Sequence, residues 1–252
     1  MLRSALSFIG HRLSAQDGFI GHCSDFLFDD EAWVARYLVA DTDEWFSSRR
    51  VLISPYALTD PDLGKASTEI PVNLTKQQIE DAPGLDTDAP VSRRHEAEMA
   101  KFYQQPFYWE GRMLWGSTLF PTFKDPPTPE ELAQHIENLD EIDASHLRSV
   151  HDVIDYRIAA SDGEIGHVED FIFENATWAI RYLVVDTRNW LPGRKVLISP
   201  EWTRDIDWYE ARVAVDMTRD EIKDSPRYDP LKPVNRDYEN EMYDYYGRKV
   251  YY

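Results

Sequence analysis

The sequence is poor in cysteine, in glycine and in long apolar stretches. Its 252 residues include one cysteine, Cys23, so an intrachain disulfide and a metal site built from several cysteines are both excluded. The 11 glycines form no glycine-rich phosphate loop. No run of about 18 apolar residues is present, so we expect no membrane-spanning helix. Residues 1–13 lack the apolar core of a secretory signal, and we therefore expect a cytoplasmic protein.

Positive charge is also scarce. Lysine and arginine total 27 against 46 aspartates and glutamates, which leaves a net charge of −19. A nucleic-acid-binding surface needs basic side chains to replace the counterions of the phosphates, so we expect no nucleic-acid partner. Anionic lipid surfaces are disfavoured for the same reason. The acidic charge keeps the protein soluble, and a basic partner or cation binding stays an open alternative.

Motifs of known catalytic centres are missing as well. The chain has no G-x-S-x-G nucleophile elbow, no H-E-x-x-H zinc motif and no C-x-x-C pair. Carboxylates are abundant, but an acidic surface alone does not make a catalytic pair. The sequence therefore predicts a protein that is not an enzyme and that needs no cofactor. An unrecognised catalytic site between two domains is the remaining alternative.

What the sequence does contain is a long internal repeat. Residues 2–55 align without a gap with residues 147–200 at an offset of 145, and 28 of the 54 aligned pairs are identical. After the prolines that end this stretch, the copies differ by two residues and realign at an offset of 143. Repeats of this length indicate a duplicated domain. We expect a domain over 1–104, a linker over 105–145 and a second domain over 146–252, which form an internal pseudo-dimer and allow a homo-oligomer.

Each repeat is rich in strand signals. Residues 19–28 and 33–42 are extended runs with many β-branched and aromatic residues, separated by an acidic four-residue loop. Short helices are predicted over 76–81 and 92–103, where Thr75 and Ser92 are suitable N-caps, and the second copy repeats both. The linker contains five prolines and many aromatic residues, so we expect it to pack onto a domain.

The repeated motif resembles a known family. D-G-x-I-G-H-x-x-D-F-x-F, then W-x-x-R-Y-L-V-x-D-T and R-x-V-L-I-S-P, is similar to the PRC-barrel, a small β-barrel of the photosynthetic reaction-centre H subunit and of the ribosome-maturation factor family. The resemblance implies a mainly β fold with short helices: two tandem PRC-like barrels, each followed by C-terminal helices. In both relatives the barrel docks onto a larger assembly. The resemblance therefore implies a protein-contacting module, and function still depends on the site.

Two histidines recur beside carboxylates. His22 and Asp25 are matched by His167 and Asp170 at the same spacing. A histidine in a strand can bind a ligand or relay protons, so these four residues are candidate binding or proton-relay positions. Neither copy supplies a cysteine or a second histidine at metal-ligand spacing, so we expect no metal site. The competing interpretation is a hydrogen-bonded structural histidine.

Two charge pairs are predicted across the strands. With residues 29–32 as the hairpin loop, Asp25 lies opposite Arg36, and the same arithmetic places Asp170 opposite Arg181. Opposite charges facing each other across antiparallel strands stabilise a sheet by about 0.2–1 kcal/mol. We interpret these residues as structural cross-strand pairs.

Several tryptophans are candidate interface anchors. Trp45 and Trp190 recur in the loop after the D-T dipeptide, and Trp109 and Trp115 lie in the linker. Exposed tryptophans at such positions are typical of protein–protein contacts. We predict a non-enzymatic protein-binding, scaffold or regulatory module with an unidentified protein partner. The alternative is cation or small-ligand binding, or a role in electron or proton transfer like that of the reaction-centre H subunit.

Overall fold

The computed structural model describes residues 1–42, 50–58, 69–85, 91–137, 145–187 and 194–252. These residues form two compact units. The first-repeat unit contains Phe8–Ser149 and Asn175–Ala179, and the second-repeat unit contains Met1–Ser7, Val150–Glu174 and Ile180–Tyr252. The units differ from the expected domains in three respects. The described part of the linker belongs to the first-repeat unit, and the N-terminal residues belong to the second-repeat unit. Residues 146–149 and Asn175–Ala179, expected in the second domain, also belong to the first-repeat unit.

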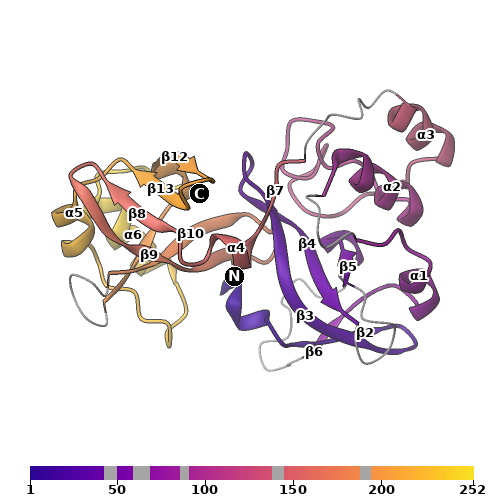
Figure 1. Cartoon of the computed structure of the whole chain (residues 1–252), viewed down its shortest axis with the longest axis horizontal. Coiled ribbons are helices and arrows are strands. Elements are labelled where there is room, and N and C mark those ends of the chain that lie inside the picture. The colour runs from indigo at the N-terminus through magenta and orange to yellow at the C-terminus, as the bar shows by residue number, and fades with distance from the viewer. Residues whose placement is uncertain (43–49, 59–68, 86–90, 138–144, 188–193) are drawn as a thin grey trace. The chain divides into compact units, whose positions relative to one another are not determined.

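The first-repeat unit is built around a sheet with the strand order β5-β4-β3-β2-β6 (Figure 1). All neighbours are antiparallel except β2 and β6, which are parallel. Helices α2 and α3 lie side by side in this unit. The strands are β2 (Arg12–Ala15), β3 (Gly18–Asp29), β4 (Val34–Asp41), β5 (Arg50–Ile53) and β6 (Glu69–Pro71), and the helices are α1 (Lys76–Glu80), α2 (Arg93–Tyr103), α3 (Pro129–Glu137) and the 3₁₀ turn η2 (Pro55–Ala57).

The second-repeat unit repeats this order as β11-β10-β9-β8-β13-β12. The pair β8 and β13 is parallel, like its counterpart β2 and β6. The predicted class, mainly β with short helices in two barrel-like domains, is confirmed. The strands are β8 (Arg157–Ala160), β9 (Gly163–Glu174), β10 (Ile180–Asp186), β11 (Lys195–Ile198), β12 (Thr203–Asp207) and β13 (Arg212–Val215), and the helices are α4 (Val150–Val153), α5 (Arg219–Asp224), α6 (Arg236–Tyr245) and the 3₁₀ turn η3 (Pro200–Trp202); the 3₁₀ turn η1 (Leu6–Phe8) lies near the N-terminus.

Two matching glycines allow neighbouring strands to approach each other closely. A Cβ atom on Gly21 would lie 1.9 Å from the carbonyl oxygen of Asp41, and one on Gly166 would lie 2.1 Å from that of Asp186. These distances are far shorter than any van der Waals contact, so only glycine fits at either position. The glycine of the D-G-x-I-G-H motif is therefore a requirement of the fold.

The helices after each sheet begin where the sequence predicts. Thr75 and Thr218 form capping boxes with Gln78 and Glu221, which satisfy the first backbone N–H groups of α1 and α5. The aspartate of each Asp-Gly turn also takes part, since Asp17 Oδ1 accepts a hydrogen bond of 2.8 Å from the N–H of Lys76. Asp162 accepts the equivalent bond from Arg219. Each turn aspartate thus joins a hairpin to the start of a helix.

Each sheet is completed by the first strand of the other repeat. Strand β1 (Leu2–Ser4) pairs antiparallel with β9, within the second-repeat unit. Strand β7 (Leu147–Ser149) pairs antiparallel with β3, within the first-repeat unit. The chain therefore exchanges its two short leading strands reciprocally between the repeats.

The predicted cross-strand charge pairs are wrong. Asp25 lies opposite Val39, because the hairpin turn extends through Trp33, whose φ is +53°, and Arg36 occupies a β-bulge. Arg36 instead forms an ion pair with Asp29, at 3.3 Å between Nη2 and Oδ2.

The second repeat has the same arrangement. Asp170 lies opposite Val184, and Arg181 falls in a bulge. The Nη2 atom of Arg181 is 2.7 Å from the Oε2 atom of Glu174. Trp178, with a φ of +61°, extends this turn as Trp33 does in the first repeat.

Candidate functional site

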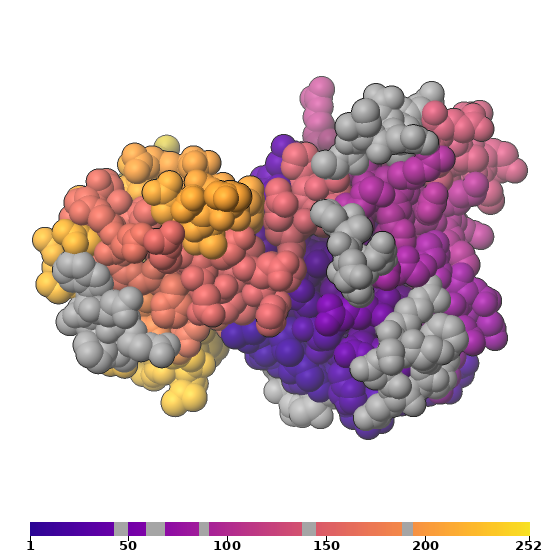
Figure 2. Space-filling view, in the orientation of Figure 1, coloured from indigo at the N-terminus to yellow at the C-terminus, as the bar shows by residue number. Residues whose placement is uncertain are grey.

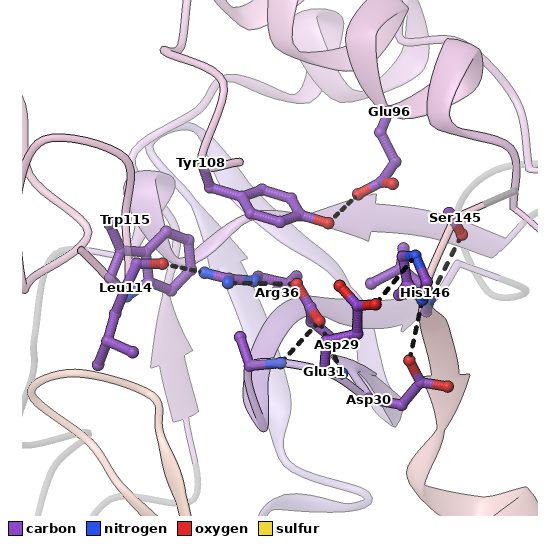
Figure 3. Close-up of polar contacts among 12 residues, drawn as sticks. Asp29, Asp30, Glu31, Arg36, Glu96, Tyr108, Leu114, Trp115, Ser145 and His146 are labelled. Carbon is purple, nitrogen blue, oxygen red and sulfur yellow. Dashed lines mark hydrogen bonds and ion pairs between the residues drawn. The ribbon is translucent and has the colours of Figure 1, made fainter. Parts of the chain in front are cut away.

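Arg36 is at the centre of a buried polar cluster in the first-repeat unit (Figure 3). Besides its ion pair with Asp29, it donates a hydrogen bond to the carbonyl oxygen of Leu114. Its guanidinium carbon lies 3.9 Å from the ring centroid of Tyr108 and 5.0 Å from that of Trp115. Burial lowers the pKa of Arg36, and Tyr108 and Asp29 act in the opposite direction. This arginine therefore holds the segment after α2 against the sheet.

Glu96 is the second charged member of the cluster. It projects from α2 with no exposed surface and accepts a hydrogen bond of 2.6 Å from the hydroxyl of Tyr108. Its other carboxylate oxygen lies 3.0 Å from Nη1 of Arg93. Burial raises the pKa of Glu96 to about 7, although Arg93 and the Tyr108 hydrogen bond favour the charged form. Glu96 can therefore change its protonation state near neutral pH.

The second-repeat unit contains the same arrangement. Buried Glu239 accepts hydrogen bonds from the hydroxyls of Tyr182, at 2.7 Å, and Tyr251, at 2.9 Å. Nη1 of Arg236 lies 3.2 Å from its other oxygen. Arg181 lies over the ring of Tyr251, 4.1 Å from its centroid. Burial, followed by the hydrogen bond to Glu239, raises the pKa of Tyr182. The two clusters are duplicates of each other.

The sequence predictions did not include this cluster. Buried Tyr37 also forms a side-chain hydrogen bond with Glu96, as Tyr182 does with Glu239. The members of the cluster follow the repeat, but at two different offsets. The pairs at an offset of 145 are Arg36/Arg181 and Tyr37/Tyr182, and the pairs at an offset of 143 are Arg93/Arg236, Glu96/Glu239 and Tyr108/Tyr251. An alignment continued across the two-residue difference, through the second helix and into the linker, would have found the shared R-x-x-E and the tyrosine that follows it.

The candidate histidines are placed separately from this cluster. His22 is half-buried, and its ring packs edge-on against Phe19 with 5.2 Å between centroids. Nε2 of His167 lies 3.8 Å from a carboxylate oxygen of exposed Asp155. Within the described ranges, no three or more histidine, cysteine or carboxylate side chains are grouped so that they could hold a metal ion. These positions contact their own strand and turn neighbours.

The candidate aspartates hold the exchanged strands. Asp25 Oδ2 accepts a hydrogen bond of 2.5 Å from the hydroxyl of Ser149 in β7. Asp170 accepts one from the hydroxyl of Ser4, and its Oδ1 accepts another of 3.1 Å from the N–H of Leu6. Burial raises the pKa of Asp170, opposed by these hydrogen bonds. The recurrence of this aspartate is explained by strand recognition.

The candidate tryptophans differ in their surroundings. Trp115 is 1% exposed and donates a hydrogen bond of 2.8 Å from Nε1 to the carbonyl oxygen of Thr177, so it is a core residue and not a surface anchor. Trp109 is half-buried and stacks on Phe107 with 4.8 Å between centroids. Trp45 and Trp190 lie outside the described residues.

Several apolar linker side chains other than the candidate tryptophans are exposed to solvent. Its segment 113–123 is braced by backbone hydrogen bonds from Met113 to Gly116 and from Trp115 to Thr118. In Figure 2 the described linker residues have magenta to pink colours, and atoms of these colours, which include those of α2, lie at the surface of this unit. Four side chains of the segment, which we call the apolar segment residues, are 38–51% exposed: Met113, Leu119, Phe120 and Phe123.

Comparison with known families identifies one part of the chain, residues 146–222. No curated protein matches the sequence. Among the described residues, no helix has the length and apolar character needed to cross a bilayer. Residues 146–222, which contain β7 to β13 and the start of α5, match the PRC-barrel domain family. The second repeat of this chain is thus a PRC-barrel domain.

Proposed function

We propose that the protein is a non-enzymatic binding or scaffold module of the cytoplasm, built from two PRC-barrel domains. The observation that carries this proposal is the exposure of Met113, Leu119, Phe120 and Phe123 on one braced segment. Large apolar side chains grouped at a surface are typical of protein–protein contact sites. The partner is therefore a protein with a complementary apolar surface.

The contacts that hold this segment in place support the proposal. Trp115 is buried within the same segment, and the carbonyl oxygen of Leu114 accepts a hydrogen bond from buried Arg36. Thr118 further donates from Oγ1 to the carbonyl oxygen of Phe120, at 2.7 Å. A segment that is ordered before binding loses less conformational entropy when a partner docks. The charged and aromatic cluster thus has a role in presenting the contact surface.

A matched pair of surface variants tests the proposal. Phe120→Asp places a charge on the apolar segment, whereas Leu231→Asp changes a 94% exposed leucine of the second-repeat unit. Proteins cross-linked to the full chain in cells are identified, and the strongest is purified for direct binding measurements. We expect Phe120→Asp to weaken that binding at least tenfold, with Leu231→Asp near wild type. Equal binding by both variants would refute the assigned surface.

A second candidate function is proton transfer or small-ligand and cation binding, as the resemblance to the reaction-centre H subunit implies. It is favoured by Glu96, a buried carboxyl whose pKa burial raises to about 7. Infrared titration of the full chain would detect a protonated carboxyl that ionises near pH 7 and that Glu96→Gln removes. Thermal-shift measurements with divalent cations and quinones test for a ligand. If neither measurement responds, this candidate is rejected.

A further inference from the structure

The two exchanged strands have the same sequence and the same pairing. Both β1 and β7 read Leu-Arg-Ser. In β1, Leu2, Arg3 and Ser4 lie opposite Glu174, Phe173 and Ile172 of β9. In β7, the same three residue types lie opposite Asp29, Phe28 and Leu27 of β3, which are the equivalent positions of the first repeat. We call these two pairing edges the β9 slot and the β3 slot.

Each slot recognises the strand through one aspartate. In the β9 slot, the hydroxyl of Ser4 donates to Asp170, and in the β3 slot the hydroxyl of Ser149 donates to Asp25. Both carboxylates are oriented by the next backbone N–H of their own strand, at 2.7 Å from Phe171 and 2.8 Å from Phe26. Each aspartate is therefore already oriented to accept a hydrogen bond from a serine at the third position of the incoming strand.

The backbone supplies the remaining recognition. The N–H of Ala5 donates to the carbonyl oxygen of Phe171 at 2.8 Å. Hydrogen-bonded pairs alternate along an antiparallel ladder, so Arg3 opposite Phe173 is the next hydrogen-bonded pair. Addition of a short strand to a sheet edge through main-chain bonds and selected side chains is a general mode of peptide recognition.

We propose that the β9 slot also accepts this strand in trans, from the segment Met1–Ser7 of a second copy of the chain. The groups that recognise the strand are the same whichever chain supplies it. All three residues of β1 are half-buried, and Ala5 after them is buried, so release of the segment breaks the hydrogen bonds of Ser4, Ala5 and Leu6 described above. The strand of the same chain competes at an effective concentration on the order of millimolar. Exchange between copies therefore becomes measurable when that strand is disabled or when protein is concentrated. This inference is independent of the proposed function.

A proline substitution in the full chain opens the slot for measurement. Arg3→Pro removes the backbone donor of the hydrogen-bonded pair, whereas the matched control Arg3→Ala keeps it. The probe is a fluorescent peptide of residues 1–8, followed by anisotropy. We expect saturable binding to Arg3→Pro and at least tenfold weaker binding to Arg3→Ala and to the wild type.

Two further peptides test which residues of the incoming strand the β9 slot recognises. A peptide of residues 146–153, which also carries Leu-Arg-Ser, should displace the probe. The probe with Ser4→Ala should bind about tenfold or more weakly, because it loses a hydrogen bond to a charged acceptor. Equal binding of the serine and alanine peptides to folded Arg3→Pro, or no binding of either, would overturn the proposal.

The swapped dimer is tested by refolding. Wild-type chains with two different tags, refolded together at high concentration, should yield dimers that carry both tags, and Arg3→Pro should yield fewer. If Arg3→Pro does not fold alone, the readout is recovery of its circular dichroism on refolding with each peptide. Recovery with the Leu-Arg-Ser peptides alone supports the proposal. Recovery with neither peptide, or the absence of mixed dimers from the wild type, contradicts it.

Discussion

Tyr108 donates a hydrogen bond of 2.6 Å to Glu96, and both side chains are buried in the first-repeat unit. Tyr251 and Glu239 repeat this relationship at 2.9 Å in the second-repeat unit. In each case a residue beyond the second helix of the repeat returns to a carboxylate on that helix. The duplicated contact therefore fixes the chain after the helix, which in the first repeat leads directly into the apolar segment.

Glu96 makes stability depend on pH in a defined direction. Burial raises its pKa from 4.5 to about 7, so between these values the folded chain binds more protons than the unfolded chain. The contribution of Glu96 to stability is complete below about pH 4.5 and is lost as the pH rises towards 7. In the wild type, the contribution of Glu96 should lower the free energy of unfolding by on the order of 3 kcal/mol as the pH rises across this window. Glu96→Gln should abolish this decrease, which urea unfolding at several pH values measures.

The control for this prediction is Glu98→Gln, because Glu98 is half-exposed on the same helix. It should leave the pH dependence nearly unchanged, since exposed ion pairs contribute about 0–1 kcal/mol. A parallel pH dependence for wild type and Glu96→Gln would show that Glu96 ionises as it does in the unfolded chain.

Loss of the Arg36 side chain should be costly. Arg36→Met removes the partner of buried Asp29 and leaves the carbonyl oxygen of Leu114 without this donor. Removal of one member of a buried ion pair costs about 3–5 kcal/mol. Arg94→Met, in a half-exposed pair with Glu98, should cost less than about 1 kcal/mol. Chemical denaturation compares the two, and equal losses would disprove the structural role of Arg36.

Gly166 should tolerate no side chain. In Gly166→Ala the new methyl group would lie 2.1 Å from the carbonyl oxygen of Asp186, so strands must separate, at a cost of about 2 kcal/mol or more. Gly247→Ala is the control, because its φ is +60° but nothing lies within 4 Å of the added atom. It should cost about 1–2 kcal/mol from backbone strain alone. The melting temperatures of the two variants show which substitution destabilises the protein more. A smaller loss of stability for Gly166→Ala than for Gly247→Ala would contradict the steric argument.

Trp115, a buried residue of the linker, should stabilise the first-repeat unit. Trp115→Phe keeps an aromatic ring but removes the donor to Thr177, and it leaves a cavity, so we expect a loss of about 2–3 kcal/mol. Trp109→Phe, at a half-buried stacked position, should lose less. Tryptophan fluorescence is changed by both substitutions, so circular dichroism is the appropriate probe. Similar stability of the two variants would argue against a core role for Trp115.

Local features of the fold were predictable because they follow local rules. The capping boxes at Thr75 and Thr218 and the strands of each repeat can be read from spacing and residue type. The bulge at Arg36 could not be read in this way. Apolar alternation does not reveal which residue is extruded from a ladder, or that Trp33 adopts a positive φ.

The candidate site was less predictable for a different reason. The residues around Glu96 come from two strands, a helix and the linker, and only packing brings them together. The identical Leu-Arg-Ser segments were visible in the sequence. Their partners were not, because the matching positions of β3 and β9 offer the same edge and the same aspartate to either strand.

The reciprocal placement of the leading strands sets an order of events during synthesis. Residues 2–4 are made before their partners, residues 172–174, which follow about 170 residues later. At typical elongation rates this delay is on the order of ten seconds or more. Strand β1 therefore has no β9 to pair with while the first repeat is synthesised. A truncated product that stops before residue 147 would contain neither β7 for the first sheet nor β9 as the partner of β1.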